Sequence, residues 1–197
     1  SRLMAGRIGE ESKLDHAVAA ALALAFTALG SGDRVGLAVF DRELRAYVAP
    51  RARRSEIGAF VAAVQPVEPR LVEADYVALA RELAHRQRQR ALIVILSDFV
   101  EAAGRGVTEP LLVLARRHRV LLVTLRDPIF ADLAPRAGAA GDVAGAARRV
   151  VLHELLQERE ATLGALRRGG IETLDLEPGQ ITSDVLNRYL AIRHAPE

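Results

Sequence analysis

Three aspartates in this sequence stand where the ligand sites of α/β proteins are commonly found. Asp41, Asp98 and Asp127 each come at the end of an apolar, strand-like run of residues. Ligands of open parallel sheets bind beyond the carboxyl ends of the strands, so an acid at that edge is a better site candidate than an acid elsewhere. Two carboxylates about 5 Å apart repel by roughly 3 kcal/mol at an effective dielectric constant near 20. Converging acids at this edge would therefore need a metal cation, an arginine or a proton.

Each aspartate also has a structural interpretation. Aspartate is a favoured helix N-cap, and Asp127 before Pro128 is typical of a cap followed by proline at the first helical position. Asp41 suits the turn of a β-hairpin. For Asp98, the structural role of a cap and the functional role of a strand-end acid are both open.

The sequence lacks the signatures of several other kinds of site. It has no cysteine, which excludes disulfides, thiolate metal sites and cysteine nucleophiles. The phosphate-binding pattern G-x-x-x-x-G-K-[ST] and the hydrolase pattern G-x-S-x-G do not occur, and no two histidines have the spacing of a zinc site. We interpret His118, next to Arg117, as part of a solvated helix end rather than as a catalytic base.

Composition favours one globular domain without a nucleic-acid partner. The 197 residues suffice for a single core, and the 27 basic residues nearly balance the 25 acidic ones. Lys13 is the only lysine, so nearly all cations are arginines, and these gather at predicted helix ends with few aromatic residues among them for stacking on bases. The most apolar segment, Ala17 to Leu29, is shorter than the roughly 20 residues of a membrane span and is predicted to be a core helix.

The hydrophobic pattern predicts elements that bring the acids to one edge. Ser12 and Asp15 have the spacing of a capping box, and apolar residues then recur with helical period up to Gly30. The run from Ala91 to Phe99 is typical of a parallel strand buried on both faces. The expected order is helix 12–30, an antiparallel hairpin of strands 34–40 and 44–48, helices 55–64 and 75–85, strand 91–97, helix 108–117, strand 120–125, helix 141–168, strand 171–176 and a last helix from residue 182. This alternation predicts an α/β fold with a doubly wound, mainly parallel sheet and an antiparallel edge hairpin.

A series of short motifs together resembles the bacterial DUF58 family, a domain of unknown function that is itself similar to the von Willebrand factor A (vWA) domain. The motifs are, in order, Gly32-Asp33-Arg34-Val35-Gly36-Leu37, Phe40-Asp41, Glu68-Pro69-Arg70-Leu71-Val72-Glu73-Ala74-Asp75-Tyr76, Leu96-Ser97-Asp98, Leu125-Arg126-Asp127-Pro128 and Asn187-Arg188-Tyr189-Leu190. The resemblance covers nearly the whole chain and implies a Rossmann-like vWA fold over residues 1–197 as a single domain. The first, central strand of a vWA sheet has no counterpart here, so we expect a fragment of a longer protein that lacks this strand.

The resemblance also implies a metal site. vWA domains that bind a metal use a metal-ion-dependent adhesion site (MIDAS), with D-x-S-x-S after the first strand, a later threonine and an aspartate after the fourth strand. Asp98 matches the last of these, Ser1 matches the first serine, and Asp75 stands near the position of the threonine. Leu3 replaces the second serine, which implies a degenerate site for Mg²⁺ or Mn²⁺ built from Ser1, Asp75 and Asp98. An alternative hypothesis is that Arg2 neutralises Asp75 and Asp98 in place of a metal.

The function implied by the resemblance is protein interaction. Members of the family are encoded beside MoxR-type AAA+ ATPases, and vWA proteins of this kind are thought to be adaptors in chaperone-like maturation of other complexes. The first hypothesis is therefore a non-enzymatic adaptor with a protein partner. The alternatives are a metal-dependent phosphoesterase or nuclease that uses strand-end acids, and a structural oligomerisation domain. Many members carry membrane helices before this domain, so we expect a cytoplasmic domain of a membrane-anchored protein, without membrane contact of its own.

Overall fold

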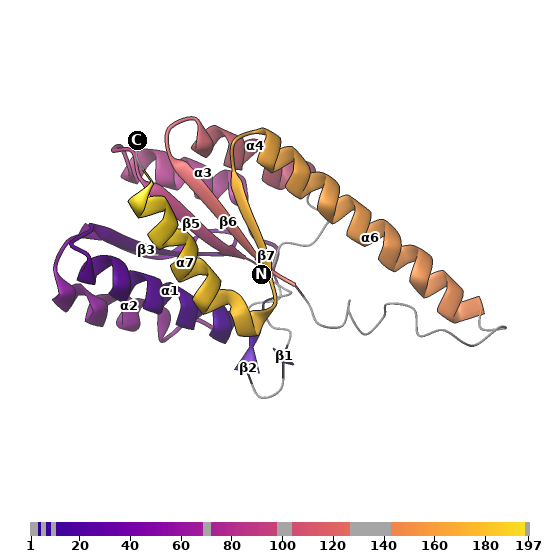
Figure 1. Ribbon diagram of the computed structural model, residues 1–197, viewed down its shortest axis with the longest axis horizontal. Coiled ribbons are helices and arrows are strands. Elements are labelled where there is room, and N and C mark those ends of the chain that lie inside the picture. Colours follow the sequence, from indigo (N-terminus) through magenta and orange to yellow (C-terminus); the bar gives the residue numbers. More distant parts are fainter. Residues whose placement is uncertain are drawn as a thin grey trace.

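The computed structural model describes residues 4, 7–8, 11–68, 72–97, 104–126 and 143–195, and the structural statements below concern these residues (Figure 1). The helices are α1 (Lys13–Gly30), α2 (Ile57–Val64), α3 (Tyr76–Arg86), α4 (Gly104–Ala115), α6 (Val143–Arg168) and α7 (Ile181–His194), with the 3-10 turns η2 (Arg54–Glu56) and η4 (Pro178–Gln180). The strands are β1 (Arg7–Ile8), β2 (Glu11–Ser12), β3 (Val35–Phe40), β4 (Leu44–Arg51), β5 (Leu92–Ser97), β6 (Arg119–Leu125) and β7 (Glu172–Leu176).

Strands β5, β6 and β7 form a parallel sheet with β6 in the middle. The residues of β6 from Val120 to Leu125 are buried. Because side chains alternate across a strand, Val120 and Leu122 pack with α3, α4 and α6, whereas Leu121 and Val123 pack with α1 and α7. Helices on both faces explain why the sequence of β6 is an unbroken aliphatic run.

Strands β3 and β4 form a separate antiparallel hairpin, as the short turn at Asp41 predicts. The hairpin packs on α1 and α2 through a small core that contains Ala25, Leu29 and Phe60. The parallel sheet and the hairpin confirm the mixed α/β class. Within the described residues, no strand joins the hairpin to the parallel sheet, and the two-residue strands β1 and β2 pair only with each other.

Helix α1 begins with the predicted capping box. The Ser12 side chain accepts the N–H of Asp15, and the Asp15 carboxylate accepts the N–H of Ser12 at 2.7 Å. The helix has the length and apolar composition of a membrane span, a test that the core helices of soluble proteins also meet. Here α1 packs against α7 and α2, and Ala17, Ala20 and the lone lysine Lys13 are buried within it.

The prediction that β5 is buried on both faces is only partly correct. Ile95 and Ser97 are buried, but Leu92, Ile93, Val94 and Leu96 are half-buried. The difference arises because only one edge of β5 is paired with β6. The other edge faces a cavity of about 1440 Å³, which is lined on its opposite side by β3.

Candidate functional site

Asp75 lies where the end of β3 meets the start of α3. It is the N-cap of α3, and its Oδ1 accepts the N–H of Ala78 at 2.9 Å. The N–H of Asp75 donates to the carbonyl oxygen of Asp41 at 2.9 Å, which ties the turn after β3 to the helix. The residue predicted to take part in a metal site therefore holds the start of a helix in place.

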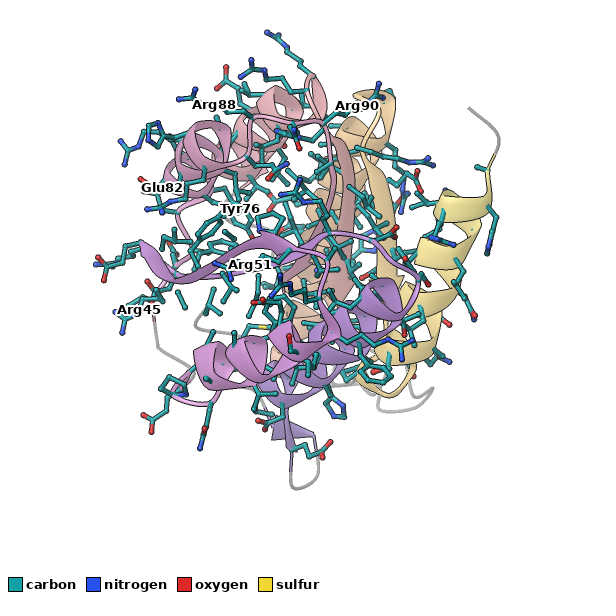
Figure 2. The ribbon with its side chains drawn as sticks, turned by 90° about the vertical axis from the view of Figure 1, so that its left-hand side faces the viewer. Arg45, Arg51, Tyr76, Glu82, Arg88 and Arg90 are labelled. Atoms are coloured by element: carbon teal, nitrogen blue, oxygen red, sulfur yellow. The ribbon has the colours of Figure 1, made fainter. Side chains whose placement is uncertain are left out.

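Tyr76 connects this corner with the end of β5. Its hydroxyl group is hydrogen-bonded to Oγ of Ser97 at 2.6 Å, and both side chains are buried. The ring of Phe40 packs edge-to-face on Tyr76, with 5.7 Å between the ring centroids. Figure 2 shows Tyr76 between α3 and the hairpin. The carboxyl ends of β3 and β5 thus lie at the same corner, beside Asp75.

We expect Tyr76→Phe to lower the free energy of unfolding by about 1 to 2 kcal/mol, because the buried Ser97 hydroxyl loses a hydrogen-bond partner. Chemical denaturation measures the effect. Ser97→Ala and the double variant complete a cycle, in which the double variant should cost less than the sum of the two single changes. Strictly additive effects would show that this hydrogen bond does not hold the corner together.

The structure describes one of the residues proposed for the metal site, Asp75. The others, Ser1 and Asp98, lie outside the described residues, as do the proposed charge partner Arg2 and the third strand-end acid, Asp127. Within the part of the chain that the structure describes, no three histidine, aspartate or glutamate side chains are grouped so that they could hold a metal ion.

Of the structural roles predicted for Asp41 and His118, the first is confirmed and the second is wrong. Asp41 has the predicted turn role, since its Oδ1 accepts the N–H of Glu43 at 3.2 Å and its Oδ2 lies 4.0 Å from Nε of Arg45. The interpretation of His118 as part of a solvated helix end is wrong, because its side chain is buried at the start of β6. Burial, together with the positive charge of Arg117, lowers the pKa of His118.

The structure contains a charged cluster at the carboxyl ends of β6 and β7 that no sequence motif predicts. Asp175 Oδ1 accepts hydrogen bonds from Arg159 at 2.5 Å and from the Thr124 hydroxyl at 2.8 Å, and Asp175 Oδ2 accepts one from Arg126 at 3.0 Å. Burial alone raises the pKa of Asp175. The hydrogen bonds from Arg159 and Thr124 and the charges of the two arginines outweigh burial, so the pKa lies below its usual value.

This cluster anchors α6 to the edge of the sheet. Both carboxylate oxygens of Asp175 are engaged by arginines, so Asp175 is a structural acid rather than a metal ligand. One sequence signal points to it: Arg159 interrupts the apolar stripe of α6 that contains Leu163 and Leu166. A cation in such a stripe requires a counter-charge on the element that it faces.

The fold and the corner define a class of protein: a mixed α/β domain with helices on both faces of a parallel sheet and polar side chains gathered at its carboxyl edge. Residues 3–147 match the family described as "Protein of unknown function DUF58", and the chain belongs to this family. The resemblance drawn from the motifs is confirmed to that extent.

Distant relatives are found in mycobacteria. Uncharacterised proteins of Mycobacterium bovis and Mycobacterium tuberculosis are each 32% identical to this chain over 123 residues, which is 61% of this chain. The chain spans 38% of the length of each of these relatives.

Proposed function

We propose that this domain is a non-enzymatic protein-interaction module with a Rossmann-like vWA fold, and that it serves as an adaptor for a MoxR-type AAA+ ATPase in the chaperone-like maturation of other complexes. Membership of the DUF58 family and the ordered motifs that resemble it support the vWA assignment. The mixed α/β architecture with its antiparallel hairpin is compatible with it. In this proposal the domain faces the cytoplasm and belongs to a membrane-anchored protein.

The interaction proposal rests mainly on the exposed first part of α6. This helix of 26 residues packs on the body through its second part, where Leu163 and Leu166 are fully buried. Its first part extends away from the body (Figure 1). Val150 and Val151 there are 58% and 55% exposed, and in this proposal the partner covers them.

The position of this surface favours a partner at the carboxyl edge. α6 ends just before the amino end of β7, so its first part lies on the side of the sheet where β5, β6 and β7 end. The same side carries the corner of Asp75 and Ser97. One partner could therefore contact the strand-end loops and the start of α6 together.

The partner proposal is tested with the full-length protein and the MoxR-type ATPase encoded in the same genome. Binding is measured by calorimetry for the wild type and for the double variant Val150→Asp/Val151→Asp. We expect the double variant to weaken binding at least tenfold, which corresponds to about 1.4 kcal/mol, because two apolar contacts are replaced by charges.

Val113→Asp is the matched control for this experiment, since Val113 is 50% exposed and belongs to α4 rather than to α6. It should leave the affinity unchanged. An equal loss in both variants would contradict a role for α6, and an ATPase that does not bind the wild type would overturn the MoxR partnership.

We further propose that the MIDAS is degenerate and that Arg2 neutralises Asp75 and Asp98 in place of a metal. The use of Asp75 as a helix cap supports this, because one of its oxygens is already engaged. Calorimetric titration of the full-length protein with Mg²⁺ and Mn²⁺ should then show no binding of micromolar affinity.

The matched variants in this titration are Asp98→Ala and Asp75→Asn. Asparagine is also a good N-cap, so Asp75→Asn removes the charge and keeps the helix start. Micromolar binding in the wild type that either variant abolishes would sink the arginine hypothesis and restore the metal site.

A further inference from the structure

The segments that lead into β5, β6 and β7 meet at one edge of the parallel sheet. In the register of the sheet, Leu92 lies beside Arg119 and Leu121 lies beside Glu172, so the three strands begin together. The N–H of Arg119 donates to the carbonyl oxygen of Ala91 at 2.9 Å, just before β5. Residues that enter these parallel strands are therefore gathered at the amino edge, opposite the carboxyl edge that carries the candidate site.

Five exposed arginines stand at this edge, each a few residues before the start of a strand. We call them the amino-edge cluster, and its members are Arg88, Arg90, Arg116, Arg117 and Arg168. Figure 2 shows Arg88 and Arg90 where α3 ends and β5 begins. Within the part of the chain that the structure describes, none of the five forms an ion pair with an acid.

Acids at the same edge are already paired with other arginines. Glu172 accepts hydrogen bonds from Arg119 at 2.6 Å and from Arg188 at 2.6 Å. Glu82, one turn before the end of α3, accepts a hydrogen bond from Arg86 at 3.1 Å. These pairs neutralise one another and leave the positive charge of the amino-edge cluster uncompensated.

Arginines near helix ends can also satisfy the last carbonyl groups of a helix, and here two other arginines have that role. Arg54 donates to the carbonyl oxygen of Gly30 at 3.3 Å, and Arg193 donates to that of Ser31 at 2.8 Å, both at the end of α1. Within the described residues, the side chains of the amino-edge cluster make no such hydrogen bond. Their guanidinium groups are therefore free to bind an external anion.

The chemistry of the cluster favours an extended array of phosphate groups. The planar guanidinium group binds a phosphate through two parallel hydrogen bonds. Segments 87–91, 116–118 and 167–171 contain no aromatic residue that could stack on a nucleic-acid base. The five arginines are spread over the entrances of three strands rather than along one helix. A broad layer of phosphates without bases is what the surface of an anionic bilayer presents.

We propose that the amino-edge cluster docks this domain on the surface of a bilayer that contains anionic phospholipids. This replaces the expectation that the domain has no membrane contact of its own. The arginines are scattered in the sequence, and only the parallel sheet brings them to one edge. Docking turns the carboxyl edge, with Asp75 and Ser97, away from the bilayer and toward solution. The contact does not depend on the proposed ATPase partnership.

Modification of arginine by phenylglyoxal tests the docking in the full-length protein, with each modified residue identified by mass spectrometry. The protein is studied on vesicles of phosphatidylcholine and on vesicles that also contain phosphatidylglycerol. The cluster should react about tenfold more slowly on the anionic vesicles, and high salt should remove this protection. Arg42 and Arg81, which are exposed elsewhere, are internal controls and should react equally on both. Equal rates for the cluster on the two kinds of vesicle would overturn the proposal.

A matched pair of variants separates this edge from net charge. Each arginine at an anionic surface contributes about fivefold to binding, so Arg116→Gln/Arg117→Gln should abolish most of the protection of the other cluster arginines. Both side chains are exposed and unpaired within the described residues, so the fold should be kept. Arg42→Gln/Arg81→Gln removes the same charge and should leave the protection unchanged. An equal loss in both variants would contradict docking through the amino edge.

A nucleic acid is tested as a competing partner with the same measurement. A double-stranded DNA or an RNA fragment replaces the anionic lipid in the sample on phosphatidylcholine vesicles. The cluster should then react as fast as without it, because the edge offers no aromatic side chain for stacking on bases. Protection by either nucleic acid that exceeds the protection by anionic vesicles would overturn the membrane as the partner.

Discussion

Asp175→Ala should lower the free energy of unfolding by about 3 kcal/mol. The cost comes from Arg159, whose side chain is 7% exposed and loses the carboxylate oxygen that lies 2.5 Å from its guanidinium group. Removing one partner of a buried ion pair costs more than the intact pair contributes to stability. Urea denaturation of the wild type and the variant gives the difference directly.

Two comparisons separate this effect from a general loss of charge. The double variant Asp175→Ala/Arg159→Met should recover most of the stability, because an apolar side chain replaces the buried cation that paired with Asp175. Glu160→Ala breaks the ion pair with Arg167. The side chains of Glu160 and Arg167 are 68% and 45% exposed, so this change should cost less than about 1 kcal/mol. Equal losses in Asp175→Ala and Glu160→Ala would refute the anchoring role of Asp175.

The same cluster predicts an acid dependence of stability. The folded state holds the pKa of Asp175 below its value of 3.8 in the unfolded chain, so the contribution of Asp175 is fully present above that value. It is lost as the pH falls through the lower pKa of the folded state. Glu172, hydrogen-bonded to Arg119 and Arg188, acts in the same sense. The free energy of unfolding of Asp175→Asn should therefore change less with pH than that of the wild type below about pH 4.

Phe60→Ala is expected to cost about 3 to 5 kcal/mol, an effect as large as that of the charged cluster. Phe60 is 0% exposed and is the largest side chain of the small core between α1, α2 and the hairpin. Truncation leaves a cavity that the short helix α2 is poorly placed to close. Val61→Ala, at a neighbouring position that is 44% exposed, is the matched control and should stay within about 0.5 kcal/mol of the wild type.

Hydrogen exchange can show whether the loss in Phe60→Ala is local. Ala25, Leu29 and Phe60 form a cluster of their own, separate from the two clusters that enclose β6. We expect β3 and β4 to lose protection while β6 keeps most of it. Equal acceleration in the hairpin and in β6 would mean that both sheets unfold as one cooperative unit.

The parts of the fold that follow local rules are predictable from the sequence. Ser12 and Asp15 satisfy each other within one turn, so the start of α1 needs no tertiary information. The central strand β6 is recognisable because a run from Val120 to Leu125 with few polar groups has no other stable position than between two helical layers. The turn role of Asp41 is predictable for the same reason, since its side chain accepts a hydrogen bond from the N–H of Glu43, only two residues away.

The parts that depend on tertiary pairing are not predictable in this way. Arg159 and Asp175 lie on a helix and a strand, and nothing local shows that they meet. His118 follows a helix with polar neighbours, and only the packing around β6 reveals its burial. The half-exposure of β5 arises because only one of its edges is paired within the described residues, a property of the whole sheet rather than of the run from Ala91 to Phe99.

The burial of Lys13 determines how contacts of this domain can be mapped chemically. It is the only lysine of the chain and is 1% exposed, so lysine-directed crosslinkers find no accessible ε-amine on this domain. A partner bound to it would go unrecorded by the reagents most used for such maps. Carboxylate-directed coupling is the suitable chemistry, because 25 aspartates and glutamates are distributed along the sequence.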